Sequence, residues 1–435
     1  MDWISIFQKH IDIRCKVASD ALQALSMDGL VLGAGTSTYY FQDDQAMFFR
    51  PSHHFAHFCP VLGENHFVVV RPGEKPDLYF FHPDDFWHDH EPLGNPIWAD
   101  AFNITTFKTS ESIWAEVAKL KGFAYIGPET SLAEEAGLSA GDSLESYLNW
   151  HRCYKTDYEI QCIDRATEIA ARGHRAAKEA FFEGASEYMI HQRYLQACQV
   201  TDFELPYNGI VALNEKSAVL HYQNKRAYAD KGQVLLIDSG AQYNGYASDI
   251  TRTYASSDAP SIFQSMCRSM NTEQIKLCGM VRPQMDFSEL HYASHLAVAN
   301  ILLEHGILQG LSVEEAYTEG VTRVFYPHGV GHMLGLLVHD VGGKQKNPEG
   351  EALEKNPDHP NLRALRPLES NFVFTIEPGL YFIPMLLEDA RNKELNRYLN
   401  WDIIEAMIPC GGIRVEDNVL VTADSTKNIT RQYLT

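Results

Sequence analysis

The 435-residue chain is too long for one compact core and long enough for two domains. Its composition, 45% hydrophobic and 21% charged, is ordinary for a soluble globular protein, and its formal net charge of −21 argues against nucleic acids or anionic membranes as partners. The N-terminus shows no secretory signal, and no apolar run is long enough to span a bilayer. The eight scattered cysteines form no C-x-x-C motif, so we expect reduced thiols and a cytoplasmic location.

The first third of the chain alternates short predicted strands with helices. A helix is predicted over residues 4–25, and another over 112–120. Short strands are predicted at residues 29–35, 66–71, 77–83, 104–108 and 123–127. This alternation indicates an α/β domain, which we assign to residues 1–154.

Two histidine-rich patches lie within this domain, at residues 53–57 and 87–90. A zinc site needs more support than a local run of histidines, and neither a cysteine nor a helical pair of histidines accompanies these patches. We therefore expect both patches to be loops at a domain or subunit contact.

The remainder, residues 155–435, is predicted to be a domain of α+β character. A capping box at Thr156 and Glu159 begins a helix that runs to about residue 182. Further helices are predicted at residues 186–201, 261–279 and 287–304, and strands at 209–214, 218–222, 371–382 and 412–422. The last two strands each carry a glutamate among apolar residues.

Between these elements, residues 233–254 read as a β-hairpin with an aspartate on each arm. If Asn244-Gly245 forms the loop, Asp238 faces Thr251, and Asp249 lies one step away on the same face. If the loop lies one residue earlier, Asp238 faces Asp249 directly. In both registers the two carboxylates share one face, where they repel each other unless a cation lies between them.

Three further segments carry matching chemistry: PHGVGH at residues 327–332, TIEPG at 375–379 and IRVEDN at 413–418. Each alone has an ordinary explanation, as a structural histidine, a turn glutamate or a surface ion pair. Together with the aspartates they form an oxygen-rich donor set with one nitrogen. Such a set suits two divalent ions, with Mn²⁺ as the first candidate and Co²⁺ or Zn²⁺ as alternatives.

The motifs IDSGAQYNGYASDITRT, HGVGH, TIEPG and GGIRVEDN closely resemble those of the pita-bread dinuclear metallopeptidases, which include methionine aminopeptidase, aminopeptidase P, creatinase and prolidase. The resemblance is strong over residues 156–435. The whole chain resembles the bacterial prolidases, or Xaa-Pro dipeptidases, through DDFWHDHEPL, PYNGIVALNEKSAVLHY and NWDIIEAMIPCGGIRVEDN. One departure is Met333, where this subgroup often has proline.

This resemblance implies an N-terminal α/β domain followed by a C-terminal α+β pita-bread catalytic domain, two Mn²⁺ per subunit and a homodimer. The implied metal ligands are Asp238, Asp249, His332, Glu377 and Glu416. Among them, Asp249 and Glu416 are expected to bridge the two ions.

The implied reaction is hydrolysis of a small dipeptide with C-terminal proline, through a metal-bridging hydroxide. Glu377 would carry the proton of the attacking water to the prolyl nitrogen, and His221 would donate to the charge that develops on the scissile carbonyl. His328, His339 and Arg414 would bind the C-terminal carboxylate of the substrate, which would restrict the enzyme to dipeptides. Alternatively, His339 would contact one of the metal ligands and orient it without binding the metal itself.

Two aromatic residues complete the implied site. Tyr207 matches an aromatic residue of the pocket. By analogy with the subgroup, Trp87 and Asp44 of the N-terminal domain would reach into the active site of the partner subunit.

Alternative functions remain open at this point. The D-S-G-A sequence that begins at Asp238 also fits an aspartic protease, but these enzymes need two such motifs and the chain has one. A pita-bread module that only binds its ligand would typically lack metal ligands. Within the family, aminopeptidase P is the main alternative, and cleavage of Xaa-Pro-Yaa tripeptides would favour it. Hydrolysis of organophosphate triesters is a candidate side activity.

Overall fold

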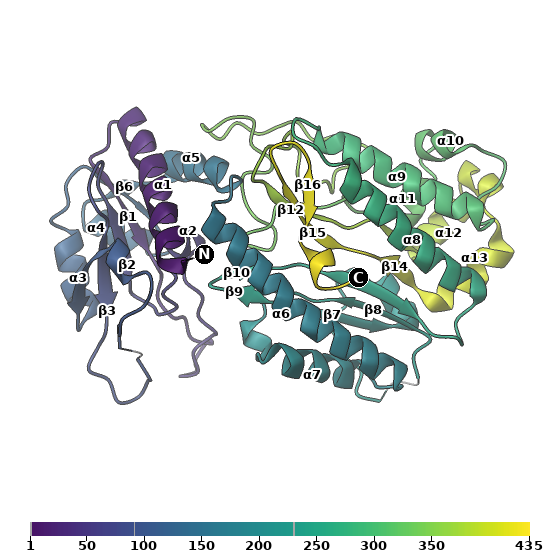
Figure 1. Ribbon diagram of the computed structural model, residues 1–435, viewed down its shortest axis with the longest axis horizontal. Coiled ribbons are helices and arrows are strands. Elements are labelled where there is room, and N and C mark those ends of the chain that lie inside the picture. Colours follow the sequence, from purple (N-terminus) through teal and green to yellow (C-terminus); the bar gives the residue numbers. More distant parts are fainter. Residues whose placement is uncertain (1, 91, 229–230) are drawn as a thin grey trace. The chain divides into compact units, whose positions relative to one another are not determined.

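The computed structural model describes residues 2–90, 92–228 and 231–435 (Figure 1). The chain forms two compact units, the first from residues up to Ile160 together with Gln345–Ala352, and the second from Gln161–Lys344 with Leu353–Thr435. The domain boundary that we predicted after residue 154 stays a prediction. Among the described residues, no helix is both long and apolar enough to cross a membrane.

The first unit is built around one mixed sheet. Its strands are β1 (Gly29–Gly33), β2 (Phe67–Val70), β3 (Asp77–Phe81), β4 (Asn103–Phe107), β5 (Phe123–Ile126) and β6 (Ser139–Ala140), in the spatial order β4-β3-β2-β1-β5-β6. β2 runs antiparallel to β1 and β3, whereas the pairs β1–β5, β3–β4 and β5–β6 are parallel. The five strands predicted from the sequence are confirmed, with β6 added at an edge.

Helices cover this sheet. They are α1 (Trp3–Ala24), α2 (His53–Phe58), α3 (Ser110–Val117), α4 (Thr130–Glu135) and α5 (Asp142–Arg152), and a 3₁₀ turn, η1, spans Ala99–Ala101. The side chains of Val31, Val69, Ile113 and Val117 meet in the core between sheet and helix. Helix α1 confirms the predicted helix over 4–25.

The first histidine patch differs from its predicted loop. Residues 53–58 form α2, because the Ser52 side chain accepts a hydrogen bond from the Phe55 backbone N–H and caps the helix. His57 is buried there, and its Nε2 lies 3.1 Å from Glu159, the N3 residue of the predicted capping box. That capping box is confirmed, since the Thr156 N–H bonds the Glu159 carboxylate at 2.8 Å.

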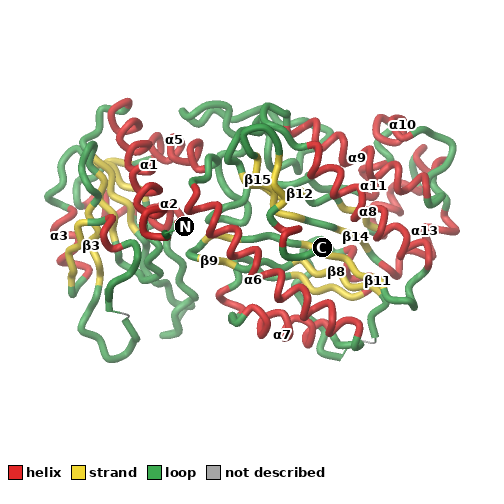
Figure 2. Tube along the Cα trace, viewed as in Figure 1, coloured by secondary structure: helices red, strands yellow, loops and turns green. Residues whose placement is uncertain are grey.

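The second unit is a helix-flanked set of small sheets (Figure 2). Its helices are α6 (Asp157–Phe182), which begins in the first unit, α7 (Glu187–Cys198), α8 (Ser261–Met280), α9 (Phe287–Glu304), α10 (Val313–Thr318), α11 (Thr322–Phe325), α12 (Pro384–Arg391) and α13 (Trp401–Met407). The 3₁₀ turns are η2 (Asp202–Glu204), η3 (Asn214–Ala218), η4 (Glu394–Tyr398), η5 (Ile408–Cys410) and η6 (Thr430–Gln432).

The described strands of this unit form four small sheets. They are β7 (Ile210–Leu213), β8 (Val234–Asp238), β9 (Gln242–Tyr243), β10 (Tyr246–Ala247), β11 (Thr251–Ala255), β12 (Val373–Ile376), β13 (Gly379–Tyr381), β14 (Gly412–Arg414), β15 (Asp417–Val421) and β16 (Thr426–Asn428). The sheet orders are β11-β8-β7, β12-β15-β16, β10-β9 and β13-β14. All the pairings in them are antiparallel.

The alternation of side chains along β7 and β8 explains how this sheet is buried. Val211 and Ile237 face α6 and α7, where they pack in one apolar cluster. Ala212 and Leu236 point to the opposite face, into a second cluster with Tyr381. Because both faces are covered, β8 is apolar at every position up to Asp238, and the carboxylate begins where the apolar run ends.

The predicted strand over 218–222 is wrong. Asn214 has φ +56°, a left-handed conformation that cannot continue β7, and its side-chain oxygen accepts from the Gln233 and Val234 N–H groups. The chain then forms η3 and a turn closed by the Tyr222 N–H on the Val219 carbonyl. His221 consequently lies on an exposed turn.

The predicted strands over 371–382 and 412–422 are each broken into two. β12 ends before Glu377 and β13 begins after Pro378, which has no N–H to extend a ladder. In the same way β14 and β15 are separated by Val415 and Glu416. Each break falls at the glutamate that the sequence singled out.

Candidate metal centre

Asp238 and Asp249 lie on the two arms of the predicted hairpin, on either side of its turn. Asp238, the last residue of β8, pairs with Thr251, the first residue of β11. Asn244 and Gly245 form the turn with φ +49° and +82°, the left-handed values that both positions of a type I′ turn require. The register with Asn244-Gly245 as the loop is therefore confirmed, and the register shifted by one residue is wrong.

A single hydroxyl connects the two aspartates. The Tyr207 hydroxyl lies 2.8 Å from Oδ1 of Asp238 and 2.5 Å from Oδ1 of Asp249. Because a phenol has one proton, it donates to one carboxylate at a time. Burial, followed by the charges of Asp238 and Asp249, raises the pKa of Tyr207 well above its usual value, so this hydroxyl stays protonated.

His332 approaches the carboxylates from the loop between α11 and β12. Its Nε2 lies 3.3 Å from Asp249, 3.7 Å from Glu377 and 3.9 Å from Glu416. Its Nδ1 is 3.0 Å from the carbonyl oxygen of Met333, which accepts a hydrogen bond when Nδ1 carries the proton. Nε2 is then free to face the carboxylates with its lone pair.

Glu377 and Glu416 are held by backbone bonds made at the strand breaks. The Glu377 N–H donates to the Val330 carbonyl at 2.8 Å. The Glu416 N–H donates to the Thr251 carbonyl at 3.0 Å, and the Thr251 hydroxyl donates to the Glu416 carboxylate at 2.7 Å. These bonds tie the loop before His332 to Glu377, and the aspartate hairpin to Glu416.

Burial dominates the electrostatics of these carboxyl groups. It raises the pKa of Glu377 to about 7 and that of Glu416 well above its usual value, and the charge of Asp249 adds to the rise at Glu416. Burial also raises the pKa of Asp238. At Asp249 burial acts in the same direction, but the hydrogen bond and charge of His332 hold the pKa below its usual value. Negative charge crowded in this way is what a divalent cation offsets.

One cavity of about 870 Å³ collects the predicted site residues of the second unit. Its lining includes Tyr207, His221, Asp238, Asp249, His328, His332, His339, Glu377, Arg414 and Glu416. Trp87 belongs to the first unit, where its side chain is 77% exposed. Its predicted contribution to the site stays a prediction.

Arg414 and His328 share a partner in this cavity. The buried Arg414 guanidinium donates to Asp238 at 2.6 Å, to the Tyr381 hydroxyl at 2.8 Å and to the Thr251 hydroxyl at 3.1 Å. Nε2 of His328 lies 2.9 Å from the same Tyr381 hydroxyl. Tyr381 thus joins two residues that the sequence assigned to the substrate carboxylate.

Two family models match the chain. Residues 161–423 match the model of metallopeptidase family M24, and residues 5–150 match the Xaa-Pro dipeptidase N-terminal domain. The chain belongs to metallopeptidase family M24. The Xaa-Pro dipeptidase of Shewanella pealeana is 40% identical over 432 residues, covering 98% of this chain and 97% of that protein. That of Pseudoalteromonas atlantica is 38% identical over 433 residues, covering 98% of both.

Solved structures of aminopeptidases share the fold of this chain. Aminopeptidase P of Escherichia coli with the inhibitor Pro-Leu superposes with a TM-score of 0.76 at 21% identity, over 98% of this chain and 96% of that one. Proline aminopeptidase P II of Yersinia pestis gives 0.75 at 21%, over 98% and 97%. The prediction of an α/β domain followed by a pita-bread catalytic domain is confirmed.

As an M24 member the protein is a metal-dependent hydrolase, and its buried residues fit a divalent cofactor. Donor atoms of Asp249, His332 and Glu416 all lie within 4.8 Å of one another. Carboxylates in majority with one imidazole are the ligands of a hard or borderline divalent ion. The predicted requirement for a divalent metal ion is confirmed at this level.

Two residues that bond the candidate site residues were missed from the sequence. Thr251 holds Glu416 and Arg414 through one hydroxyl, and Tyr381 holds Arg414 and His328. Thr251 lies inside the motif IDSGAQYNGYASDITRT, two residues after Asp249, and Tyr381 lies two residues after the TIEPG segment. Residues an even number of positions apart in a strand lie on the same face, so polar residues at such positions beside an expected ligand were the signal available in the sequence.

Proposed function

We propose that this protein is an Xaa-Pro dipeptidase that hydrolyses dipeptides with a C-terminal proline. The observation that carries the proposal is the set of five oxygen and nitrogen donors that line one cavity, in a chain similar over nearly its whole length to curated Xaa-Pro dipeptidases. The match to an Xaa-Pro dipeptidase N-terminal domain supports the same activity.

The proposed metal ligands are Asp238, Asp249, His332, Glu377 and Glu416, with Mn²⁺ as the preferred ion and Asp249 and Glu416 shared between two ions. Two divalent ions in this place supply a water molecule acidic enough to act as a nucleophile near neutral pH. Carboxylates on both arms of the hairpin and at both strand breaks support a site for two ions, since their four negative charges offset those of two divalent cations.

In this proposal Glu377 moves the proton. Its carboxylate lies 3.7 Å from His332 and 3.8 Å from His328, so it borders both the donor set and the substrate cavity. It takes the proton of the attacking water and delivers it to the prolyl nitrogen, which leaves poorly without protonation. His221 lines the same cavity from an exposed turn and donates to the developing oxyanion.

The residues proposed to bind the substrate carboxylate are His328, His339 and Arg414. A guanidinium has five N–H groups. Those of Arg414 donate one hydrogen bond each to Asp238, Tyr381 and Thr251, which leaves further N–H groups for a ligand. His339 packs edge-on against His332, with ring centroids 4.3 Å apart, and is exposed toward the cavity. The guanidinium and the imidazoles at this end of the cavity offer N–H donors to a C-terminal carboxylate, which favours a dipeptide over a longer chain.

We further propose that the protein is a cytoplasmic homodimer in which Trp87 contributes to the site of the partner subunit. Large apolar side chains on loops of the first unit support a contact surface, since Phe41, Phe86 and Trp87 are 90%, 85% and 77% exposed. Size-exclusion chromatography with light scattering tests the dimer, and Trp87→Ala should raise the KM for the dipeptide.

Aminopeptidase P activity is the second candidate, because the solved structures above share this fold. Ala-Pro and Ala-Pro-Ala, assayed side by side in Mn²⁺, separate the two activities. The proposal expects turnover of Ala-Pro and little turnover of Ala-Pro-Ala, and the reverse preference would overturn it. Hydrolysis of an organophosphate triester is proposed as a side activity and is measured in the same preparation.

A further inference from the structure

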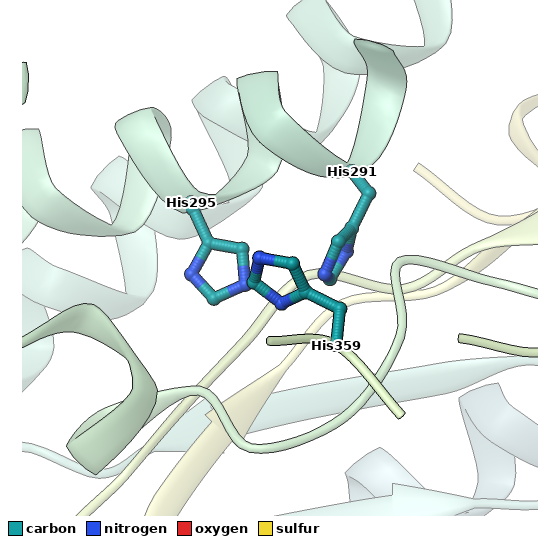
Figure 3. Close-up of side chains that lie close together, drawn as sticks. All are labelled: His291, His295 and His359. Atoms are coloured by element: carbon teal, nitrogen blue, oxygen red, sulfur yellow. The ribbon is translucent and has the colours of Figure 1, made fainter. Parts of the chain in front are cut away.

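A second group of potential metal ligands lies apart from the carboxylate centre. His291 and His295 stand one turn apart on α9, and His359 comes from the segment between α11 and β12 (Figure 3). The three rings converge, with centroid separations of 4.7, 4.4 and 4.9 Å. One nitrogen of each residue lies within 4.8 Å of one nitrogen of the others. All three side chains are buried.

These imidazoles have unused nitrogens. His291 is 3% exposed, and neither of its ring nitrogens has a hydrogen-bond partner among the described residues. Nε2 of His295 also lacks a partner there. Buried polar atoms normally have hydrogen-bond partners, so the ring of His291 has a nitrogen available for a ligand.

Hydrogen bonds to one ring nitrogen of His295 and of His359 leave the other nitrogen of each ring unused. Nδ1 of His295 lies 2.9 Å from the Thr322 hydroxyl, which leaves Nε2 facing the cluster. Nε2 of His359 lies 3.1 Å from the Tyr317 hydroxyl, which leaves Nδ1. Hydrogen bonds to the far nitrogen of a liganding histidine are the usual support of such sites.

The histidines are in the form that binds metals. Burial lowers the pKa of His291 to about 3 and that of His295 to about 2, and it also lowers that of His359. All three are therefore neutral at pH 7, with a lone pair available. The positive charge of the nearby Arg323 would repel a cation, but the carboxylate of Asp358 lies 3.9 Å from it and offsets that charge.

A small cavity gives this cluster access and room for a further ligand. It measures about 180 Å³, and its lining includes His291, His359, Arg323 and Asp358. Its wall at residues 360–362 is shared with the larger cavity of the carboxylate centre. Zinc sites with three protein ligands keep the fourth position open to water, and this cavity provides the opening.

We propose that His291, His295 and His359 bind one Zn²⁺ ion per chain, separately from the carboxylate centre. Zn–N bonds of roughly 2.0–2.1 Å require the nitrogens to draw closer, through small rotations of the rings. An all-imidazole site favours Zn²⁺ over Mn²⁺, which prefers oxygen ligands. The ion fastens the segment that carries His359, and with it one wall of the substrate cavity, to α9.

The test measures metal content after the carboxylate centre is filled with Mn²⁺. Wild type, His291→Ala, His359→Ala and the control His305→Ala are saturated with Mn²⁺, dialysed against a low Zn²⁺ concentration and analysed for both metals. His305 ends the same helix but lies outside the cluster. The proposal expects one Zn²⁺ more per chain in wild type and the control than in the other two variants, with equal Mn²⁺ in all four. Equal Zn²⁺ in all four proteins would overturn it.

A second measurement separates the loss of Zn²⁺ binding from a folding defect. His359→Gln keeps most of the volume of the side chain, and urea unfolding without Zn²⁺ establishes that each variant is folded. Zn²⁺ that binds only the folded protein raises the unfolding midpoint of wild type and of His305→Ala. It should leave the midpoint of His359→Gln unchanged when Mn²⁺ is present, and an equal rise in all three proteins would contradict the site.

Discussion

The guanidinium of Arg414 lies 2.6 Å from the carboxylate of Asp238, and both groups are largely buried. The arginine therefore fixes an expected metal ligand before any substrate arrives. Burial acts to lower the pKa of Arg414, but the charges of Tyr381 and Asp238 raise it well above its usual value, so the group stays cationic.

Arg414→Lys tests this relationship. Lysine cannot donate to Asp238, Tyr381 and Thr251 at once, and breaking a buried ion pair costs roughly 3–5 kcal/mol. We expect kcat/KM for Ala-Pro to fall by about 100-fold or more, together with weaker Mn²⁺ binding. Kinetics at saturating and limiting Mn²⁺ separate the two effects. Wild-type affinity for both Mn²⁺ and substrate would show that Asp238 does not depend on Arg414.

Tyr207→Phe removes the hydroxyl that bonds both aspartates. Hydrogen bonds to charged groups contribute about 1.5–3 kcal/mol, so the free energy of unfolding of the metal-free variant should fall by that amount. The loss should be smaller with Mn²⁺ present, because the ion then offsets the two charges. Urea denaturation with and without Mn²⁺ measures the difference, with the exposed Tyr39→Phe as control. An equal loss in both states argues against a cation between the aspartates.

Gly331→Ala perturbs the loop of His332. An added Cβ would lie 1.9 Å from the Thr375 carbonyl oxygen, so the loop must move away from β12. We expect much weaker Mn²⁺ binding and a folded protein. Gly279→Ala in α8 is the control, since nothing lies within 4 Å of its Cβ and it should stabilise the helix by up to about 1 kcal/mol. Isothermal titration with Mn²⁺ compares the two variants, and unchanged binding by Gly331→Ala contradicts the assignment of His332.

How far the sequence predicts this structure depends on whether the determinant is local. The sequence placed the hairpin but left two registers open, and the structure selects the one whose turn has left-handed residues at both central positions, Asn244 and Gly245. The strand break at Glu377 was also signalled, by Pro378, but the apolar run around it favoured one continuous strand. Asn214 gives no comparable signal for the end of β7, since its left-handed conformation is held by Gln233, far along the chain.

The sites divide in the same way. Residues in compact motifs, such as His332 and Glu416, could be selected from the sequence, and the structure places them in one cavity. The spacing of His291 and His295 fits one face of the predicted helix over 287–304, but His359 lies in a long irregular segment. No periodicity brings such a residue to that helix, so the histidine cluster emerges only in three dimensions.

The first unit provides a prediction on pH. Burial acts to raise the pKa of Glu159, but Arg14 and His57 hold it well below its usual value. Burial lowers the pKa of His10 to about 4. Both groups have folded pKa values below their unfolded ones, so each contributes stability at neutral pH that is lost on acidification. His10 acts as the pH falls from about 6.5 toward 4, and Glu159 below about 4.5.

Glu159→Gln isolates the carboxylate. It leaves the buried Arg14 without its charge partner, which costs roughly 3–5 kcal/mol at pH 7. The difference from wild type should shrink as the pH falls below about 4.5, where the unfolded wild type binds the proton that its folded form refuses. Urea denaturation from pH 7 to about pH 3 follows this difference, and a difference that grows on acidification has the wrong sign for this account.

The most direct measurement titrates metal-stripped protein with Mn²⁺ while following both bound metal and Ala-Pro hydrolysis. The five-ligand account predicts no hydrolysis without metal and full activity when two Mn²⁺ are bound per chain. Asp238→Asn and Glu416→Gln should each lower both the bound Mn²⁺ and the activity. Hydrolysis that persists in the stripped protein, or full activity in both variants, would contradict the account.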